Sequence, residues 1–151
     1  MLGVRFTVGN EYGNILAKIT DNIIEKEDIC KINYEDIHLT PPTNNNSLFP
    51  NKVISGDEFI HCISNKIYYI CFAKISVFAN KNDICEVMTF TNYFQSKCKF
   101  VLFFTDAIFV DVYSNSSNIL HQLKVNAEKY GFDNIEYIYK ISEKDLDLMK
   151  E

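Results

Sequence analysis

Two β-prone runs joined by a very short connection constrain the fold of this chain more than any other feature. Residues 99–105 and 107–114 are rich in Phe, Val and Ile, and only Asp106 separates them. Side chains of these types favour strands, and a connection this short lets the two strands pair only as an antiparallel hairpin. The chain is therefore expected to build its core on antiparallel pairing.

Helices and strands follow one another irregularly along the rest of the chain. Apolar spacing predicts helices over 11–19, 55–65, 91–97 and 117–131, and strands over 2–8, 29–34, 68–78, 85–90 and 132–140. Ser55 and Ser116 are expected to cap their helices, and Gly131 to end the last one. The pattern predicts an α+β fold with a mixed, mostly antiparallel sheet of about five to seven strands, flanked by three or four helices.

The length of 151 residues is typical of one domain, so we expect a single α+β domain over 1–151. Residues 40–52 are rich in Pro and Asn, which favour turns, and predict an exposed loop that is too short to divide two domains. The acidic segment 142–151 predicts a terminal helix or tail.

Charge and cysteine usage exclude several classes of protein. The net charge is −5, and Arg5 is the only arginine, so a nucleic-acid binder is not expected, whereas a cationic partner is favoured. Apolar runs are too short for a membrane span, and no leader segment is recognisable, which predicts a cytoplasmic protein. The five cysteines lack a C-x-x-C pair and predict buried thiols in a reducing compartment, with neither a metal site nor a cofactor.

Catalytic motifs are absent from the sequence. No glycine-rich phosphate loop and no hydrolase or metalloprotease signature occurs. The neighbours His61 and Cys62 would point about 100° apart on a helix, so they do not form a nucleophile–base pair. The chain is therefore not expected to be an enzyme.

Carboxylates and tyrosines are the candidate binding residues. Segment 21–36 holds six acidic and two basic residues, with Tyr34 among them. Asp111 interrupts an apolar strand, so it either faces solvent or anchors a Lys or Arg of a partner. The partner-binding candidates are Glu25, Glu27, Asp28, Tyr34, Glu35, Asp36 and Asp111.

Several runs resemble a small family of bacterial proteins to which no activity is assigned. They are FTVGNEYG at 6–13, LFP at 48–50, ISGDE at 54–58, YYICFA at 68–73 and GFDNIEYI at 131–138. This resemblance implies a fold unit and no catalytic residues. The acidic C-terminal end departs from the family pattern.

A second resemblance concerns the general type of protein, and it rests on size and composition instead of motifs. A small acidic chain without enzyme motifs is similar to the immunity proteins, or antitoxins, of contact-dependent growth inhibition systems. Its many Lys, Asn and Ile residues and single Arg suggest the AT-rich coding that is frequent in such gene cassettes. The resemblance implies an immunity protein that neutralises a cognate toxin, a basic nuclease, through an acidic and aromatic face.

The alternative is a small-molecule-binding or regulatory domain, with a small enzyme as a third reading. A crevice beside the 99–114 hairpin that held Asp111 and a histidine would favour these alternatives. A flat or convex acidic face would favour the inhibitor.

Overall fold

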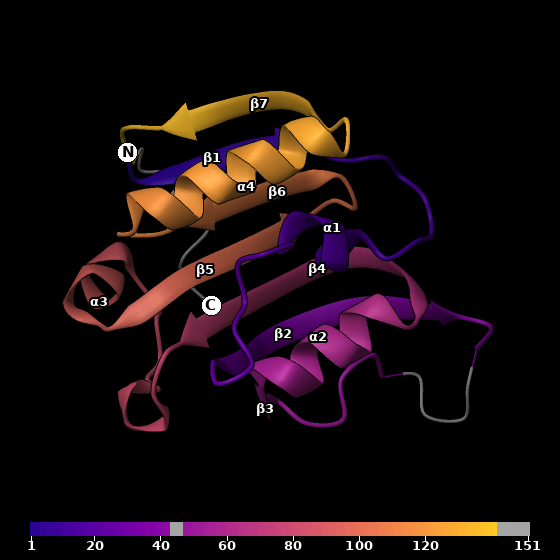
Figure 1. The fold of residues 1–151 in the computed structure, drawn as a ribbon, viewed down its shortest axis with the longest axis horizontal. Helices are drawn as coiled ribbons and strands as arrows, with labels where there is room; N and C mark the ends of the chain where they lie inside the picture. The colour runs from indigo at the N-terminus through magenta and orange to yellow at the C-terminus, as the bar shows by residue number, and fades with distance from the viewer. Residues whose placement is uncertain (43–46, 142–151) are drawn as a thin grey trace.

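The computed structural model describes residues 1–42 and 47–141. Its centre is one seven-stranded sheet with the order β3-β2-β4-β5-β6-β1-β7, in which all neighbouring strands are antiparallel (Figure 1). The strands are β1 (Gly3–Thr7), β2 (Ile29–Thr40), β3 (Val53–Ser55), β4 (Ile67–Phe78), β5 (Cys98–Thr105), β6 (Phe109–Tyr113) and β7 (Asp133–Ile138). The helices are α1 (Ile15–Ile19), α2 (Gly56–Ser64), α3 (Phe90–Gln95) and α4 (Ser117–Lys129), with a short 3-10 helix η1 (Lys81–Asp83). The expected α+β class is confirmed.

The expected hairpin is formed by β5 and β6. Its turn residues Asp106 and Ala107 both have positive φ angles, of 50° and 67°. Left-handed residues at both central positions give a turn whose twist matches that of the flanking strands. The Ala107 amide donates to the Cys71 carbonyl at 3.0 Å, so the turn is also fixed against β4.

Three helices cover one face of the sheet. Figure 1 shows α1, α2 and α4 lying over one face of the sheet, and their apolar side chains close the main core. The Ser55 and Ser116 hydroxyls accept hydrogen bonds from the Glu58 and Ile119 amides at 3.1 and 3.3 Å, as expected for caps. Gly131 follows α4 with φ of +72°, which confirms the expected stop. Among the described residues, no helix is both long and apolar enough to cross a bilayer.

The described residues cover the opposite face of the sheet, called the outer face below, at one end. Phe78, Phe103 and Tyr113 on the strands join Phe90 and Tyr93 of α3 in a second apolar cluster. The prediction of a strand over 85–90 is wrong. These residues form no strand, and Phe90 begins α3. Val87 is buried in this cluster, so its segment covers the sheet instead of joining it.

Three other boundaries differ from expectation. The first helix begins at Ile15 and not at residue 11, and β2 continues to Thr40 instead of ending at 34. Leu48 and Phe49, which belong to the loop predicted to be exposed, are buried, because Phe49 stacks on Phe59 with ring centroids 5.2 Å apart. Residues 43–46 of that loop and the predicted acidic segment 142–151 lie outside the described residues.

The close packing of residues 25–28 against the start of α2 can be tested by a substitution at Gly56. A Cβ atom at Gly56 would lie 1.9 Å from the Glu25 carbonyl oxygen, and the Gly56 amide donates to the Asp28 carbonyl at 2.6 Å. Gly56→Ala should therefore lower the free energy of unfolding by about 2 kcal/mol or more, because backbone must move to admit the methyl group. Urea unfolding measures this change.

Gly13→Ala is the matched control, since a Cβ atom there meets no other atom within 4 Å. Its unfolding midpoint should stay close to that of the parent chain. Equal midpoints for the Gly56→Ala variant and the parent would contradict the close approach of residue 25 to α2.

Candidate functional site

A row of side chains crosses the outer face from β2 to β7. Strand pairing places its members side by side, and residues directly opposite one another in paired strands point to the same face. The row consists of Tyr34, Lys74, Phe103, Asp111, Arg5 and Glu136. Four of the six carry charges. What this face can bind therefore depends on which groups already pair with these charges.

Asp111 and Arg5 form a two-pronged ion pair in this row. Arg5 Nε and Nη2 donate to the two Asp111 carboxylate oxygens at 2.8 and 2.9 Å, and Glu136 lies 4.0 Å from Arg5 Nη1. Asp111 is 9% exposed. The Asp111 carboxylate therefore binds a cation of its own chain. The sequence had led us to expect that it would face solvent or bind a Lys or Arg of a partner, and the structure shows neither.

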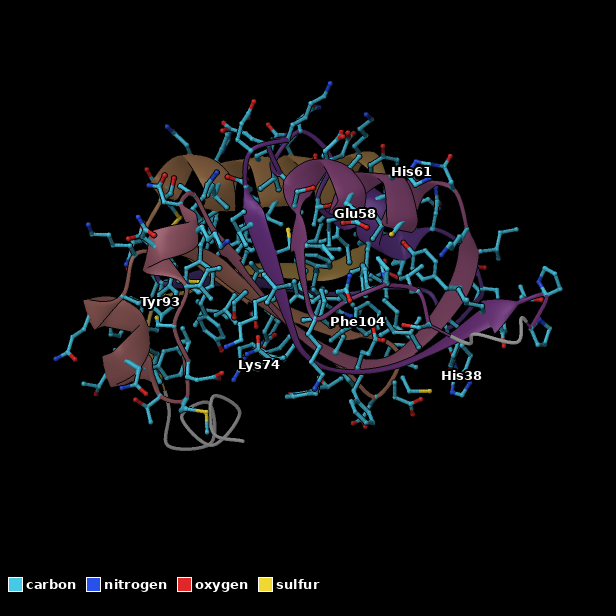
Figure 2. All side chains as sticks on the ribbon, turned by 90° about the horizontal axis from the view of Figure 1, so that it is seen from below. His38, Glu58, His61, Lys74, Tyr93 and Phe104 are labelled. Carbon is cyan, nitrogen blue, oxygen red and sulfur yellow. The ribbon has the colours of Figure 1, made fainter. Side chains whose placement is uncertain are left out.

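Lys74 is the second charge held within the row. It is fully buried, its Nζ donates to the Val87 carbonyl at 2.9 Å, and its ammonium lies 5.9 Å from the centre of the Phe103 ring. Figure 2 shows Lys74 and His38 on the side of the sheet opposite Glu58 and His61 of α2. The centre of the outer face is thus filled by internal contacts.

An exposed patch lies on the part of the outer face that α3 leaves open. We define this outer patch as Tyr34, Asp36, Phe72 and Phe109. The two phenylalanines are 44% and 46% exposed, and the Tyr34 and Phe72 rings contact each other at 5.8 Å between centroids. All four side chains lie on paired strands, so the patch is a preformed surface.

Two more candidates, Glu25 and Glu27, are exposed in the segment before β2. Asp28, in contrast, is 2% exposed. Both of its carboxylate oxygens accept from Lys99 Nζ at 3.0 Å, and one accepts from the Glu25 amide at 2.9 Å. Asp28 and Asp111 therefore serve the fold, and the binding surface proposed below omits them.

Glu35 points to the side of β2 opposite Tyr34 and Asp36. It lines a cavity of about 390 Å³ together with Ser47, Phe49 and Lys52. Burial raises the pKa of Glu35, although a hydrogen bond with Ser47 and the charge of Lys52 partly oppose the shift. Its Oε2 atom accepts no hydrogen bond from the described residues. The arrangement suits a polar ligand group or a neutral carboxyl.

A cluster that the sequence analysis missed shares Asp36 with the outer patch. His38 Nε2 is 3.1 Å from Asp36 Oδ1, and ligand atoms of Asp36, His38 and Cys71 all lie within 4.8 Å of one another. Loss of hydration, and then the Asp36 carboxylate, raise the pKa of the Cys71 thiol. The sequence signal for this cluster is the spacing of Asp36 and His38, which are two residues apart. That spacing places both side chains on one face only if the strand extends past residue 34, and β2 reaches Thr40.

The cysteines also differ from expectation. Cys30, Cys62 and Cys98 are buried as expected, but Cys71 is half-buried and Cys85 is exposed. All five are free thiols.

The crevice beside the hairpin is not lined by the residues that would have favoured the alternative function. It measures about 460 Å³ and is bounded by Arg5, Thr7, Phe109, Asn134, Ile135 and Glu136. This lining contains neither a histidine nor Asp111.

Comparison with known proteins places the chain in a family. A family model described as "Protein of unknown function (DUF2691)" matches residues 1–148. The chain belongs to the DUF2691 family. It is also similar to the "Uncharacterized protein YncE" of Bacillus subtilis (strain 168), with 25% identity over 138 residues that cover 90% of each chain. No solved structure matches it.

Membership in DUF2691 supports the resemblance to a small bacterial family that the sequence motifs indicated. The family description assigns no activity, so a function for this DUF2691 chain must be argued from its own surface.

The raised pKa of Glu35 gives a prediction of pH dependence. Because the folded state binds the Glu35 proton more tightly than the unfolded state, stability falls as the pH rises through and above the ordinary value of 4.5. Glu35→Gln should therefore raise the free energy of unfolding at neutral pH, and the gain should shrink as the pH falls towards 4.5 and be largely lost below it. Urea unfolding at a series of pH values measures it.

Glu27→Gln is the control, because Glu27 is exposed. It should change stability little at any pH. A Glu35→Gln variant less stable than the parent at neutral pH would show that the carboxylate is stabilised, and not penalised, in its cavity.

Proposed function

We propose that this DUF2691 chain is an immunity protein that binds and neutralises a cationic protein toxin through the outer patch. The carrying observation is the pair of phenylalanines, Phe72 and Phe109, each nearly half exposed on an otherwise well-filled sheet face. Aromatic side chains dominate the binding energy of protein interfaces when a partner covers them. Tyr34 and Asp36 add the tyrosine and carboxylate that such a face requires.

The rigidity of the patch supports the same reading. Tyr34 and Asp36 lie on β2, which pairs with β4 along most of its length, and Phe72 lies on β4 beside them. Side chains held on paired strands lose little conformational freedom on binding, which lowers the cost of forming a complex. An inhibitor of this kind needs no catalytic geometry.

Charge supports a cationic partner. The chain carries a net charge of −5, and the exposed Glu25 and Glu27 lie near the start of the strand that holds Tyr34. A basic nuclease in the cytoplasm is the partner that this charge and the resemblance of type favour.

The test is expression in bacterial cells of the protein encoded immediately upstream, alone and together with this chain. We expect growth arrest by the neighbour alone, rescue by co-expression, and co-purification of the two chains. The Tyr34→Ala/Phe72→Ala double variant should lose rescue and bind at least about tenfold more weakly, since aromatic anchors commonly contribute this much or more. Association of the parent pair should slow as salt is added.

Phe94→Ala is the matched control, because Phe94 is 46% exposed on α3, outside the outer patch. It should rescue growth as the parent does. A harmless neighbour, or arrest without rescue and without binding, would contradict the proposal. Rescue by the double variant at full strength would contradict the assignment of the patch.

A small-molecule-binding function is the second candidate, and the Glu35 cavity is the observation that favours it. A cavity of about 390 Å³ is within the size range of ligand sites, and it holds a carboxyl, an ammonium and an aromatic ring. A screen of small polar and cationic metabolites for a rise in Tm tests it. The rise should occur in the parent chain and be lost in Glu35→Gln.

A further inference from the structure

A register irregularity between β2 and β4 creates an unusual meeting of side chains. Asp36 pairs with Phe72 and Ile37 with Ile70, so Cys71 is an extra residue on β4 without a register partner. Such a bulge redirects the side chain of the extra residue and is over-represented beside functional sites. The Cys71 carbonyl accepts from the Ala107 amide at 3.0 Å, which fixes this backbone against the β5–β6 turn.

The neighbouring strand presents two further ligand types at this position. Asp36 and His38 are two residues apart on β2, so both side chains point to the same face of the sheet. His38 Nε2 lies 3.1 Å from Asp36 Oδ1, and Cys71 Sγ lies within 4.8 Å of ligand atoms of both residues. A thiol, an imidazole and a carboxylate thus converge from two adjacent strands.

We propose that Asp36, His38 and Cys71 form a binding site for one Zn²⁺ or a similar divalent transition-metal ion. This inference is independent of the proposed immunity function.

The spacing of the three ligand atoms suits this class of ion. Bonds of about 2.3 Å to sulfur and about 2.0–2.2 Å to nitrogen and oxygen, arranged tetrahedrally, separate ligand atoms by about 3.4–3.6 Å. Here the corresponding atoms lie within 4.8 Å of one another, and His38 Nε2 and Asp36 Oδ1 are 3.1 Å apart. Small side-chain rotations are therefore enough to close the site, with no movement of the strands.

The ligand types select among metals. Thiolate and imidazole prefer Zn²⁺ and its neighbours in the first transition series, whereas Mg²⁺ and Ca²⁺ require sets of oxygen ligands. A cation would also replace the contact that the Asp36 carboxylate now makes with His38. The set consequently favours Zn²⁺ over the alkaline-earth ions.

The exposure of the ligands indicates an open coordination position. The His38 and Asp36 side chains are 57% and 42% exposed, and Cys71 is half-buried. Three protein ligands with water at the fourth position describe sites at which the metal can meet a further group, in contrast to closed four-ligand structural sites. The open position faces solvent beside the outer patch.

Titration of the isolated, reduced chain with Co²⁺ tests the proposal, because a cobalt–thiolate bond absorbs in the near ultraviolet. We expect one Co²⁺ per chain with this band, visible bands of a four-coordinate ion, and displacement by Zn²⁺. Cys71→Ser should abolish the band, and His38→Gln should weaken Zn²⁺ binding by at least about tenfold, as measured by calorimetry.

Two matched controls use residues of the same types elsewhere. Cys85 is an exposed thiol and His121 an exposed histidine on α4, so Cys85→Ser and His121→Gln should bind like the parent. Thermal unfolding of each variant establishes that it folds. A parent chain without the thiolate band, or a band that persists in Cys71→Ser, would overturn the proposal. Because no partner protein takes part, the result stands whether or not the chain neutralises a toxin.

Discussion

The ion pair between Arg5 and Asp111 is the interaction on which the outer face depends. It joins β1 to β6, and β1 lies between the hairpin and the last strand β7. A carboxylate that is 9% exposed would be costly without a partner, and the only arginine of the chain provides two hydrogen bonds to it. With this pair formed, the N-terminal strand can enter the sheet next to Asp111, and β7 can complete the edge.

The same principle explains the other buried charges. Lys74 lies under the segment that contains Val87 and donates to its carbonyl, and Asp28 accepts from Lys99 and from the Glu25 amide. Each buried charge meets a partner from a distant part of the chain, which ties loops to the sheet. The acidic residues left at the surface, among them Glu25, Glu27 and Asp36, are those available to another molecule.

Consecutive residues of β2 contribute to three different candidate sites, which lie on the two faces of this strand. Tyr34 and Asp36 point to the outer face, whereas Glu35 points into the cavity beside Ser47 and Lys52. The extra residue Cys71 on β4 then brings a thiol next to Asp36 and His38. Substitutions at Phe72, Glu35 and Cys71 therefore test the proposed protein, ligand and metal sites one at a time, whereas Asp36 belongs to two of them.

Local sequence determined the elements whose signals lie within a few residues. The 99–114 hairpin, the caps at Ser55 and Ser116 and the stop at Gly131 follow from turn and capping chemistry, and together they were enough to predict an antiparallel α+β fold. Tertiary structure alone decided that β2 continues past Tyr34, that residues 85–90 cover the sheet, and that Asp28 and Asp111 are internal. Those outcomes depend on contacts such as Arg5 with Asp111, which are 106 residues apart. Local patterns carry no information about such partners, because the free energy of burying a charge is set by whatever the folded chain places beside it.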